Sequence, residues 1–248
     1  MNKSELSLLD GVNAEYIFGR LKNAGGKEIE SGKFSNNESS AALAANAFGW
    51  FHNRAELFPP LPGLEISTKI LSINVEYQAR FPWRGGRHPW LDAAIETETQ
   101  IIGIESKRFE PFRDTISVNL SDAYWRDVWG HNMRGFQSIR DKLKTRELKF
   151  QFLDAAQLLK HSFGLFSEGR RKNKSPSLYY IFAEPSQLKG KPIASSSFHT
   201  HREEAKFFKK LVAGDEVSFN FCSYRDWLST FDEQTKMHAK RILNAFKP

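Results

Sequence analysis

The segment that most restricts the fold is a pair of short strand-like runs, residues 91–97 and 100–107, separated by only two residues. Runs this close together predict an antiparallel β-hairpin with a two-residue turn at residues 98–99. In that register Asp92 falls directly opposite Glu105. A four-residue loop would keep the same register, whereas a three-residue loop would lose it.

The two faces of the predicted hairpin differ in character, because alternate residues of a strand point to opposite faces of the sheet. One face carries small and charged residues: Asp92, Ala94, Gly103, Glu105 and Lys107. The other face carries isoleucines that we expect to point into a core: Ile95, Ile102 and Ile104. Because Ala94 and Gly103 are small, we expect space beside the carboxylates for the backbone of a substrate.

The pairing of Asp92 with Glu105 has a chemical consequence. Directly opposed side chains have Cβ atoms about 4.5–5.5 Å apart, and like charges there destabilise a sheet. Two such carboxylates predict a bound cation, and oxygen ligands suit Mg²⁺ or Mn²⁺ rather than zinc. Lys107 would lie beside the ion and could orient a water molecule or stabilise charge on a phosphate. The alternative is that these charges only decorate a solvated strand.

The rest of the chain predicts a sheet covered by helices. Alternation over residues 66–80 predicts a half-buried strand whose apolar side holds Leu71, Ile73, Val75 and Tyr77. Apolar runs predict a central buried strand at 178–183 and a further strand at 216–224. Helical spacing occurs over 39–54, 122–143, 153–166, 200–212 and 232–246. This order predicts an α/β (α+β) fold, with a central mixed β-sheet flanked by helices on both faces.

The composition favours a reducing compartment. Cys222 is the only cysteine, which excludes an internal disulfide and a cysteine-cluster zinc site. The first ten residues carry Glu5 and Asp10, so no signal peptide is expected, and no segment is apolar enough to span a bilayer. These features predict a cytoplasmic protein without a membrane partner. The net charge of +7 is compatible with nucleic acid.

The order Asp92, hairpin, Glu105-Ser106-Lys107, set after a long strand and before a helical segment, resembles the PD-(D/E)XK nuclease superfamily, of restriction-endonuclease-like fold. The segments 154–161 and 178–185 also resemble the helix and strand that follow in bacterial members. The first motif of this superfamily often has Pro before the Asp, whereas this chain has Leu91 there.

The resemblance implies roles for individual residues. Asp92 and Glu105 would be the metal ligands for Mg²⁺ or Mn²⁺, and Lys107 would be the third signature residue. Gln157 lies on the following helix, where some members use Gln to hold water or substrate. The chain would then consist of an N-terminal helix and loop extension, residues 1–38, and a single nuclease-like domain, residues 39–248.

We therefore predict a Mg²⁺-dependent DNA endonuclease that hydrolyses a phosphodiester with a metal-activated water. One alternative is a catalytically inactive nuclease-like module that binds nucleic acid. Another is a glycosidase that uses the carboxylate pair, although Lys107 and the basic surface argue against it.

Three further residues are candidates near this site. Glu76, on the polar side of the long strand, is either a third carboxylate or a solvated residue. Lys160 and His161 lie three and four residues after Gln157, so they share its helix face.

Two basic clusters predict nucleic-acid contacts. Arg84 and Arg87 flank two glycines in a loop just before Asp92, with a tryptophan on either side. Arg170, Arg171 and Lys172 belong to a segment, 167–177, that we expect to be a loop. The alternatives are a tight turn for the first cluster and a solvated surface for the second.

Two other features carry weaker signals. His199 and His201 are compatible with a transition metal, but without a clear third ligand they are more typical of a helix start. Cys222 lies within a predicted strand and is expected to be a core residue.

Overall fold

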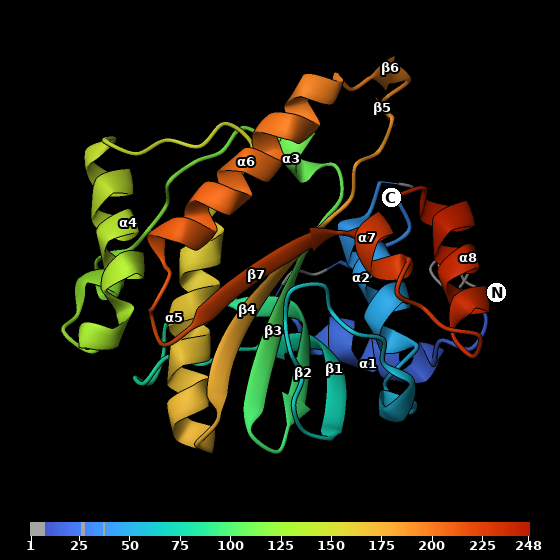
Figure 1. The fold of residues 1–248 in the computed structure, drawn as a ribbon, viewed down its shortest axis with the longest axis horizontal. Helices are drawn as coiled ribbons and strands as arrows, with labels where there is room; N and C mark the ends of the chain where they lie inside the picture. Colours follow the sequence, from blue (N-terminus) through green and yellow to red (C-terminus); the bar gives the residue numbers. More distant parts are fainter. Residues whose placement is uncertain (1–7, 26–27, 37) are drawn as a thin grey trace.

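The computed structural model describes residues 8–25, 28–36 and 38–248. Its centre is a five-stranded sheet in the order β1-β2-β3-β4-β7 (Figure 1). The strands are β1 (Ile70–Gln78), β2 (Trp90–Thr97), β3 (Gln100–Lys107), β4 (Ser175–Phe182) and β7 (Ser218–Ser223). The first three strands pair antiparallel, while β3, β4 and β7 are parallel. A separate two-stranded hairpin contains β5 (Gln187–Leu188) and β6 (Lys191–Pro192).

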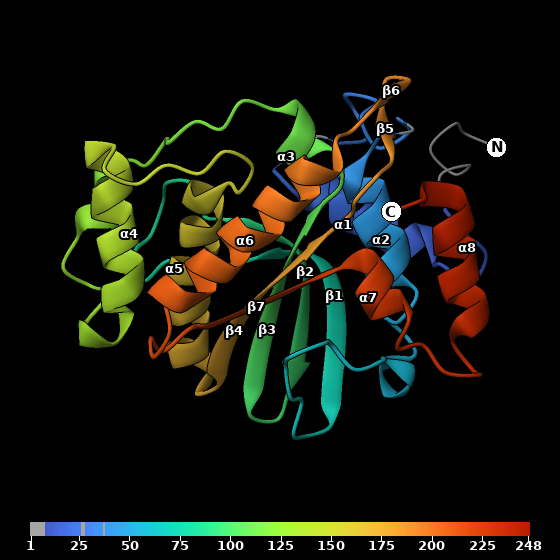
Figure 2. The same ribbon diagram turned by 45° about the horizontal axis from the view of Figure 1, so that its top comes forward.

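Helices cover both faces of the sheet, which confirms the predicted fold class (Figures 1 and 2). One face holds α1 (Ala14–Asn23), α2 (Ser40–Gly49), α7 (Tyr224–Leu228) and α8 (Lys236–Phe246). The other face holds α4 (Arg134–Thr145), α5 (Ala155–Lys172) and α6 (Ser195–Leu211). The short α3 (Glu110–Arg113) follows β3. None of the helices in the described part of the chain is long and apolar enough to cross a bilayer.

Capping side chains mark the starts of α2 and α5. The Ser39 hydroxyl accepts the backbone N–H of Ala42 at the start of α2, and Asp154 does the same for Gln157 at the start of α5. Asn37, which is also of a residue type that commonly caps a helix, lies outside the described residues. The predicted helix 39–54 ends earlier, at Gly49, and the predicted helix 122–143 begins later, at Arg134, after two short 3₁₀ turns.

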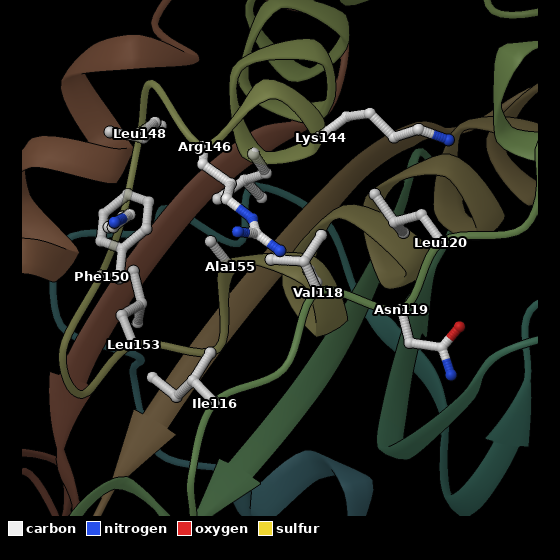
Figure 3. Close-up of a pocket in the computed structure, with 13 residues that line it drawn as sticks. Ile116, Val118, Asn119, Leu120, Lys144, Arg146, Leu148, Phe150, Leu153 and Ala155 are labelled. Atoms are coloured by element: carbon white, nitrogen blue, oxygen red, sulfur yellow. The ribbon is translucent and has the colours of Figure 1, made fainter.

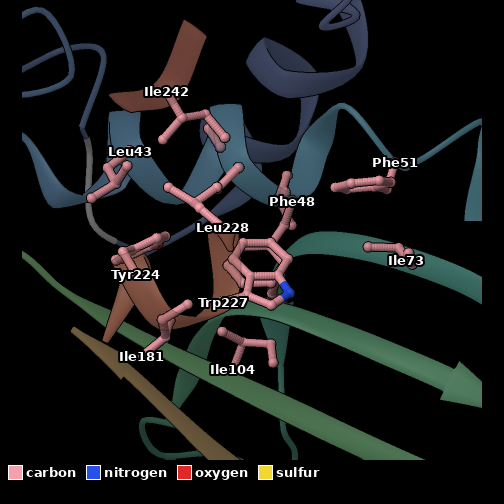
Figure 4. Packing of buried hydrophobic residues seen from close by; sticks show 14 of the residues in the cluster. Leu43, Phe48, Phe51, Ile73, Ile104, Ile181, Tyr224, Trp227, Leu228 and Ile242 are labelled. Carbon is pink, nitrogen blue, oxygen red and sulfur yellow. The ribbon is translucent and has the colours of Figure 1, made fainter. Parts of the chain in front are cut away.

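Each face of the sheet has its own hydrophobic core. On one face the Trp227 ring stacks on Phe48 with 4.8 Å between centroids, above Ile104 of β3 (Figure 4). On the other face Trp129 stacks on Phe163 of α5 at 4.4 Å. Ile17 of α1 belongs to the first core. The division of the chain at residue 38 stays a prediction.

The prediction of free space beside Gly103 is wrong. Gly103 and Ala94 are buried, and a Cβ added to Gly103 would lie 2.7 Å from both Leu91 Cδ1 and Leu165 Cδ1. The reason is that α5 packs directly across this part of the sheet, so that Leu165 fills the position that a substrate was expected to take.

Gly103→Ala is therefore expected to lower the free energy of unfolding by about 1–3 kcal/mol, because the added methyl overpacks a closed core. Urea denaturation measures this change. Gly19→Ala is the matched control, since a Cβ at that helical position meets nothing within 4 Å. Equal stability of the Gly103→Ala variant and the wild type would contradict the packing described here.

Candidate active site

The predicted hairpin register is confirmed. Ala94 pairs with Gly103 and Ala93 with Ile104 across β2 and β3. The Thr97 hydroxyl closes the turn by accepting the backbone N–H of Gln100 at 2.9 Å. The regular pairing stops after Ala93, however, so the ladder does not contain the predicted pair of Asp92 and Glu105.

Asp92 lies where β2 and β3 separate. Its Oδ2 accepts the backbone N–H of Ser106 at 2.7 Å, in place of a ladder bond. The Ser106 hydroxyl, on the far side of the strand, lies 2.7 Å from the buried hydroxyl of Tyr224. The carboxylate of Asp92 is thus tied to the backbone of the residue between Glu105 and Lys107.

Strand β1 changes face at Glu76. Val75 packs in one core and Tyr77 in the other, although residues two apart normally share a face. Glu76 has a φ of +50°, which interrupts the alternation. The predicted common side for Val75 and Tyr77 is therefore wrong. Beyond the break, the Tyr77 hydroxyl donates to Glu168 of α5 at 3.0 Å.

Strand β2 changes face at the neighbouring position. Ala93 packs in the same core as Val75, its partner in β1, whereas Leu91 packs with its own partner, Tyr77. Asp92 is thus the residue at which β2 changes face, as Glu76 is in β1. The irregular backbone brings both carboxylates to the same edge of the sheet.

Helix α1 holds the irregular segment of β1. The Val75 N–H donates to the Tyr16 hydroxyl at 3.0 Å, and Arg20 Nε donates to the Val75 carbonyl at 2.9 Å. Arg20 Nη2 also donates to the carbonyl of Glu76 at 2.5 Å. The sequence analysis missed Tyr16 and Arg20, and nothing in their local pattern distinguishes them from other helix residues.

Glu105 is the most enclosed group of the site, with 1% of its surface exposed. Its Oε1 lies 2.7 Å from Lys107 Nζ, and its Oε2 lies 2.9 Å from His161 Nε2 of α5. Burial by itself would raise the pKa of Glu105, but Lys107 and His161 lower it to about 2. Glu105 is therefore an anion in the fold, and His161 joins the site from the helix face predicted for it.

Lys107 is charged for the complementary reason. Burial would lower its pKa, but Glu105, then Glu110 and Asp92, raise it above the ordinary lysine value. Its ammonium group is therefore expected to carry a positive charge at neutral pH. The electrostatic role of Lys107 stays a prediction.

Asp92 and Glu76 resist ionisation. Burial, and then the charge of Glu105, raise the pKa of Asp92 well above its ordinary value. Burial, and then the charge of Glu28, raise the pKa of Glu76 to about 7. Without a cation, the site thus holds one stable carboxylate and two whose negative charge is unfavourable.

Glu76→Gln should change how stability depends on pH. The folded-state pKa of about 7 lies above the ordinary value of 4.5, so ionisation of Glu76 weakens the wild type as pH rises through this window. The variant should gain stability relative to the wild type across it, by at most about 3 kcal/mol. Denaturant unfolding with EDTA at several pH values measures the gain.

The control for this experiment is Glu98→Gln, which removes a carboxylate from the exposed turn between β2 and β3. A stability difference between Glu76→Gln and the wild type that does not change from pH 4.5 to 7 would show that Glu76 is not the strained carboxylate described here.

A small cavity of about 110 Å³ opens beside the ion pair. Glu105, Lys107 and Gln157 line it, so the structure brings Gln157 next to two of the predicted site residues. Tyr180 also lines it, and its hydroxyl lies 2.8 Å from His201 Nε2. Asp92 does not line this cavity and lies on β2, the strand next to β3.

The donor atoms fit a hard divalent cation. Asp92 and Glu105 supply carboxylate oxygens, which Mg²⁺ and Mn²⁺ prefer. Burial, and then repulsion by Glu105, raise the pKa of Asp92, and a bound cation would offset both effects. Within the described ranges, no three His, Cys, Asp or Glu side chains are grouped as a metal site. Two carboxylates suit an ion such as Mg²⁺, which commonly uses one or two of them and completes its shell with water and phosphate.

The loop between β1 and β2 carries Arg84 and Arg87, both exposed. It connects the end of β1 to the start of β2. Glu105 and Lys107, at the end of β3, lie at the same end of the sheet. Trp83 is only partly available as a stacking surface, because its ring packs against Trp129 at 5.6 Å between centroids.

The second basic cluster does not form the predicted loop. Arg170, Arg171 and Lys172 form the last turn of α5, where cations interact favourably with the helix dipole. They pair with acidic side chains: Arg170 with Glu216, Arg171 with Glu168, and Lys172 with Glu96. Because Glu96 is near the hairpin turn, Lys172 lies at the other end of β2 from Asp92. A nucleic-acid role for this cluster stays a prediction.

The histidines of α6 separate rather than converge. His201 is buried and contacts Tyr180, and burial lowers its pKa to about 4, whereas His199 is exposed. The interpretation of this pair as helix residues is thus favoured. Cys222 is buried, and burial raises the pKa of its thiol to about 12, as expected for a core residue.

Comparison with known proteins adds one match. A family model described as restriction endonuclease associating with ARP matches residues 8–247, nearly the whole chain. Neither the search of curated proteins nor that of solved structures returned a match.

Proposed function

This chain belongs to the family of restriction endonucleases associating with ARP, and we propose that it is a Mg²⁺-dependent DNA endonuclease of the PD-(D/E)XK type. The observation that carries the proposal is the ion pair of buried Glu105 and largely buried Lys107, 2.7 Å apart, beside Asp92 on the next strand. A charged pair with so little exposure is costly to bury, which favours a chemical role over surface decoration.

In this proposal Asp92 and Glu105 hold Mg²⁺ or Mn²⁺, with Glu76 as a further carboxylate at the same edge. A bound ion would lower the pKa of its coordinated water and neutralise charge on a phosphate. Lys107, which stays protonated, stabilises negative charge that develops on the phosphate oxygens. His161 keeps Glu105 oriented through its second oxygen, 2.9 Å away.

The proposed contacts with DNA are inferred from where three side chains lie in the structure. Gln157 lines the cavity beside Lys107 and can donate a hydrogen bond to a phosphate or a water. Arg84 and Arg87, exposed on the loop at the same edge, would contact the DNA backbone. Association with ARP, named in the description of the family, is part of the proposal for this chain as well.

The test is incubation of the purified wild type with supercoiled plasmid in Mg²⁺, in Mn²⁺ and in EDTA. Nicking or linearisation is expected with either metal and is expected to stop in EDTA. An electrophoretic mobility shift in EDTA measures binding separately. Binding without cleavage in either metal would favour the inactive module, and cleavage that persists in EDTA would contradict the metal-dependent mechanism.

A further inference from the structure

A second cavity, of about 610 Å³, lies near the carboxylate site, between residues 116–120, the end of α4 and the start of α5 (Figure 3). Its wall combines polar surface with apolar side chains that include Val118, Leu148 and Phe150. Its charged lining residues are all cations: Lys144, Arg146 and Lys149. We call this cavity the basic groove.

The basic groove adjoins the candidate active site. Ile116 lines both the groove and the small cavity formed by Glu105 and Lys107. A strand with one phosphate beside Lys107 could therefore continue into the groove. The volume is within the range of small-ligand sites, about 300–1,000 Å³.

We propose that the basic groove binds an unpaired nucleotide of the substrate strand, next to the phosphate that is cut. The inference rests on the proposed nuclease function and narrows its substrate to DNA with an unpaired or locally opened segment. Cations suit the phosphate, and the apolar side chains on the wall suit the face of a base. That face is available only when the base has left the duplex stack.

Arg146 is the central contact. Figure 3 shows its side chain extending over the groove between Val118 and Ala155. Arg146 ends α4 with a φ of +65°, a left-handed cap that favours glycine. The helix cap therefore gives no reason for an arginine, whereas a phosphate in the groove does.

The left-handed cap allows Arg146 to be replaced without an expected loss of stability. Arg146→Gly removes the guanidinium and should keep or raise the melting temperature, because glycine suits the left-handed cap. The matched control is Lys247→Gly, which removes an exposed cation from the left-handed cap of α8, with a φ of +46°, on the opposite face of the sheet.

Fluorescence anisotropy with a short single-stranded DNA oligonucleotide, in EDTA and over a series of salt concentrations, measures binding without cleavage. Arg146→Gly should weaken binding about tenfold. It should also reduce the slope of log affinity against log salt by about 0.7, the value for one phosphate contact on a single strand. Lys247→Gly should bind like the wild type.

Two results would overturn the inference. One is wild-type affinity in Arg146→Gly. The other is displacement of the oligonucleotide by an acidic peptide of equal charge at the same concentration, which would make the groove a docking site for an acidic protein segment. Failure of the nuclease function is distinguishable, since it would leave the metal-free binding of the wild type and the loss in Arg146→Gly intact.

Discussion

Lys107→Met is expected to reduce DNA cleavage by about a hundredfold to a thousandfold, the usual effect of removing one group that stabilises transition-state charge. Methionine keeps most of the length of the side chain but carries no charge. An ammonium group is not a metal ligand, so calorimetric titration should show that Mn²⁺ binding is retained. Rates of plasmid nicking in Mg²⁺ measure the loss.

The same variant should lose about 3–5 kcal/mol of stability in EDTA, because it leaves the buried carboxylate of Glu105 without its cation partner. Glu105 is 1% exposed, so water cannot take the place of the lost ammonium group. Adding Glu105→Gln should restore stability but not cleavage. Lys206→Met, which breaks an exposed pair with Glu203, should change stability by less than about 1 kcal/mol.

If Lys107→Met cuts DNA as fast as the wild type, the assignment of Lys107 is wrong. If it loses cleavage only because it is unfolded at the assay temperature, circular dichroism will show this. The cleavage rate is then compared at a temperature where both proteins are folded.

Asp92→Asn is expected to abolish both metal binding and cleavage. The amide oxygen still accepts the Ser106 N–H, so the backbone should be preserved. Loss of one of the two anionic ligands should weaken the site below detection when no substrate phosphate is present to complete the shell of the ion. The variant separates the charge of Asp92 from its hydrogen bond.

Asp92→Asn should also stabilise the metal-free protein at pH 8. The raised pKa of Asp92 means that its ionisation opposes folding above the ordinary aspartate pKa, and the neutral amide removes this opposition. Melting in EDTA should shift upward by at least about 2 °C. With Mn²⁺ present, the wild type should melt higher and the variant should not respond. A variant that still responds to Mn²⁺ would remove Asp92 from the metal site.

The sequence predicted the hairpin well because its determinants are local. Two strands with two residues between them can pair in few ways, and Thr97 closes the turn within its own segment. The alternation in β1 failed at Glu76 because its backbone is held by Tyr16 and Arg20, which precede Val75 by 59 and 55 residues. No periodicity within the strand contains that information.

The path of α5 explains the other differences. Leu165 closes the space at Gly103, and the basic residues expected in a loop extend the helix. Helical spacing placed His161 on the same helix face as Gln157, but only helix–sheet packing shows that it contacts Glu105. The residue types of the site were thus predictable, whereas their burial was not.

The most direct test of the central claim is anomalous diffraction from a crystal of the wild-type protein soaked with Mn²⁺. We expect a manganese peak that is coordinated by carboxylate oxygens of Asp92 and Glu105, with Lys107 beside it. A peak elsewhere, or no peak while Glu105 keeps its contacts with Lys107 and His161 at 2.7 and 2.9 Å, would contradict the assignment of these residues as the metal site.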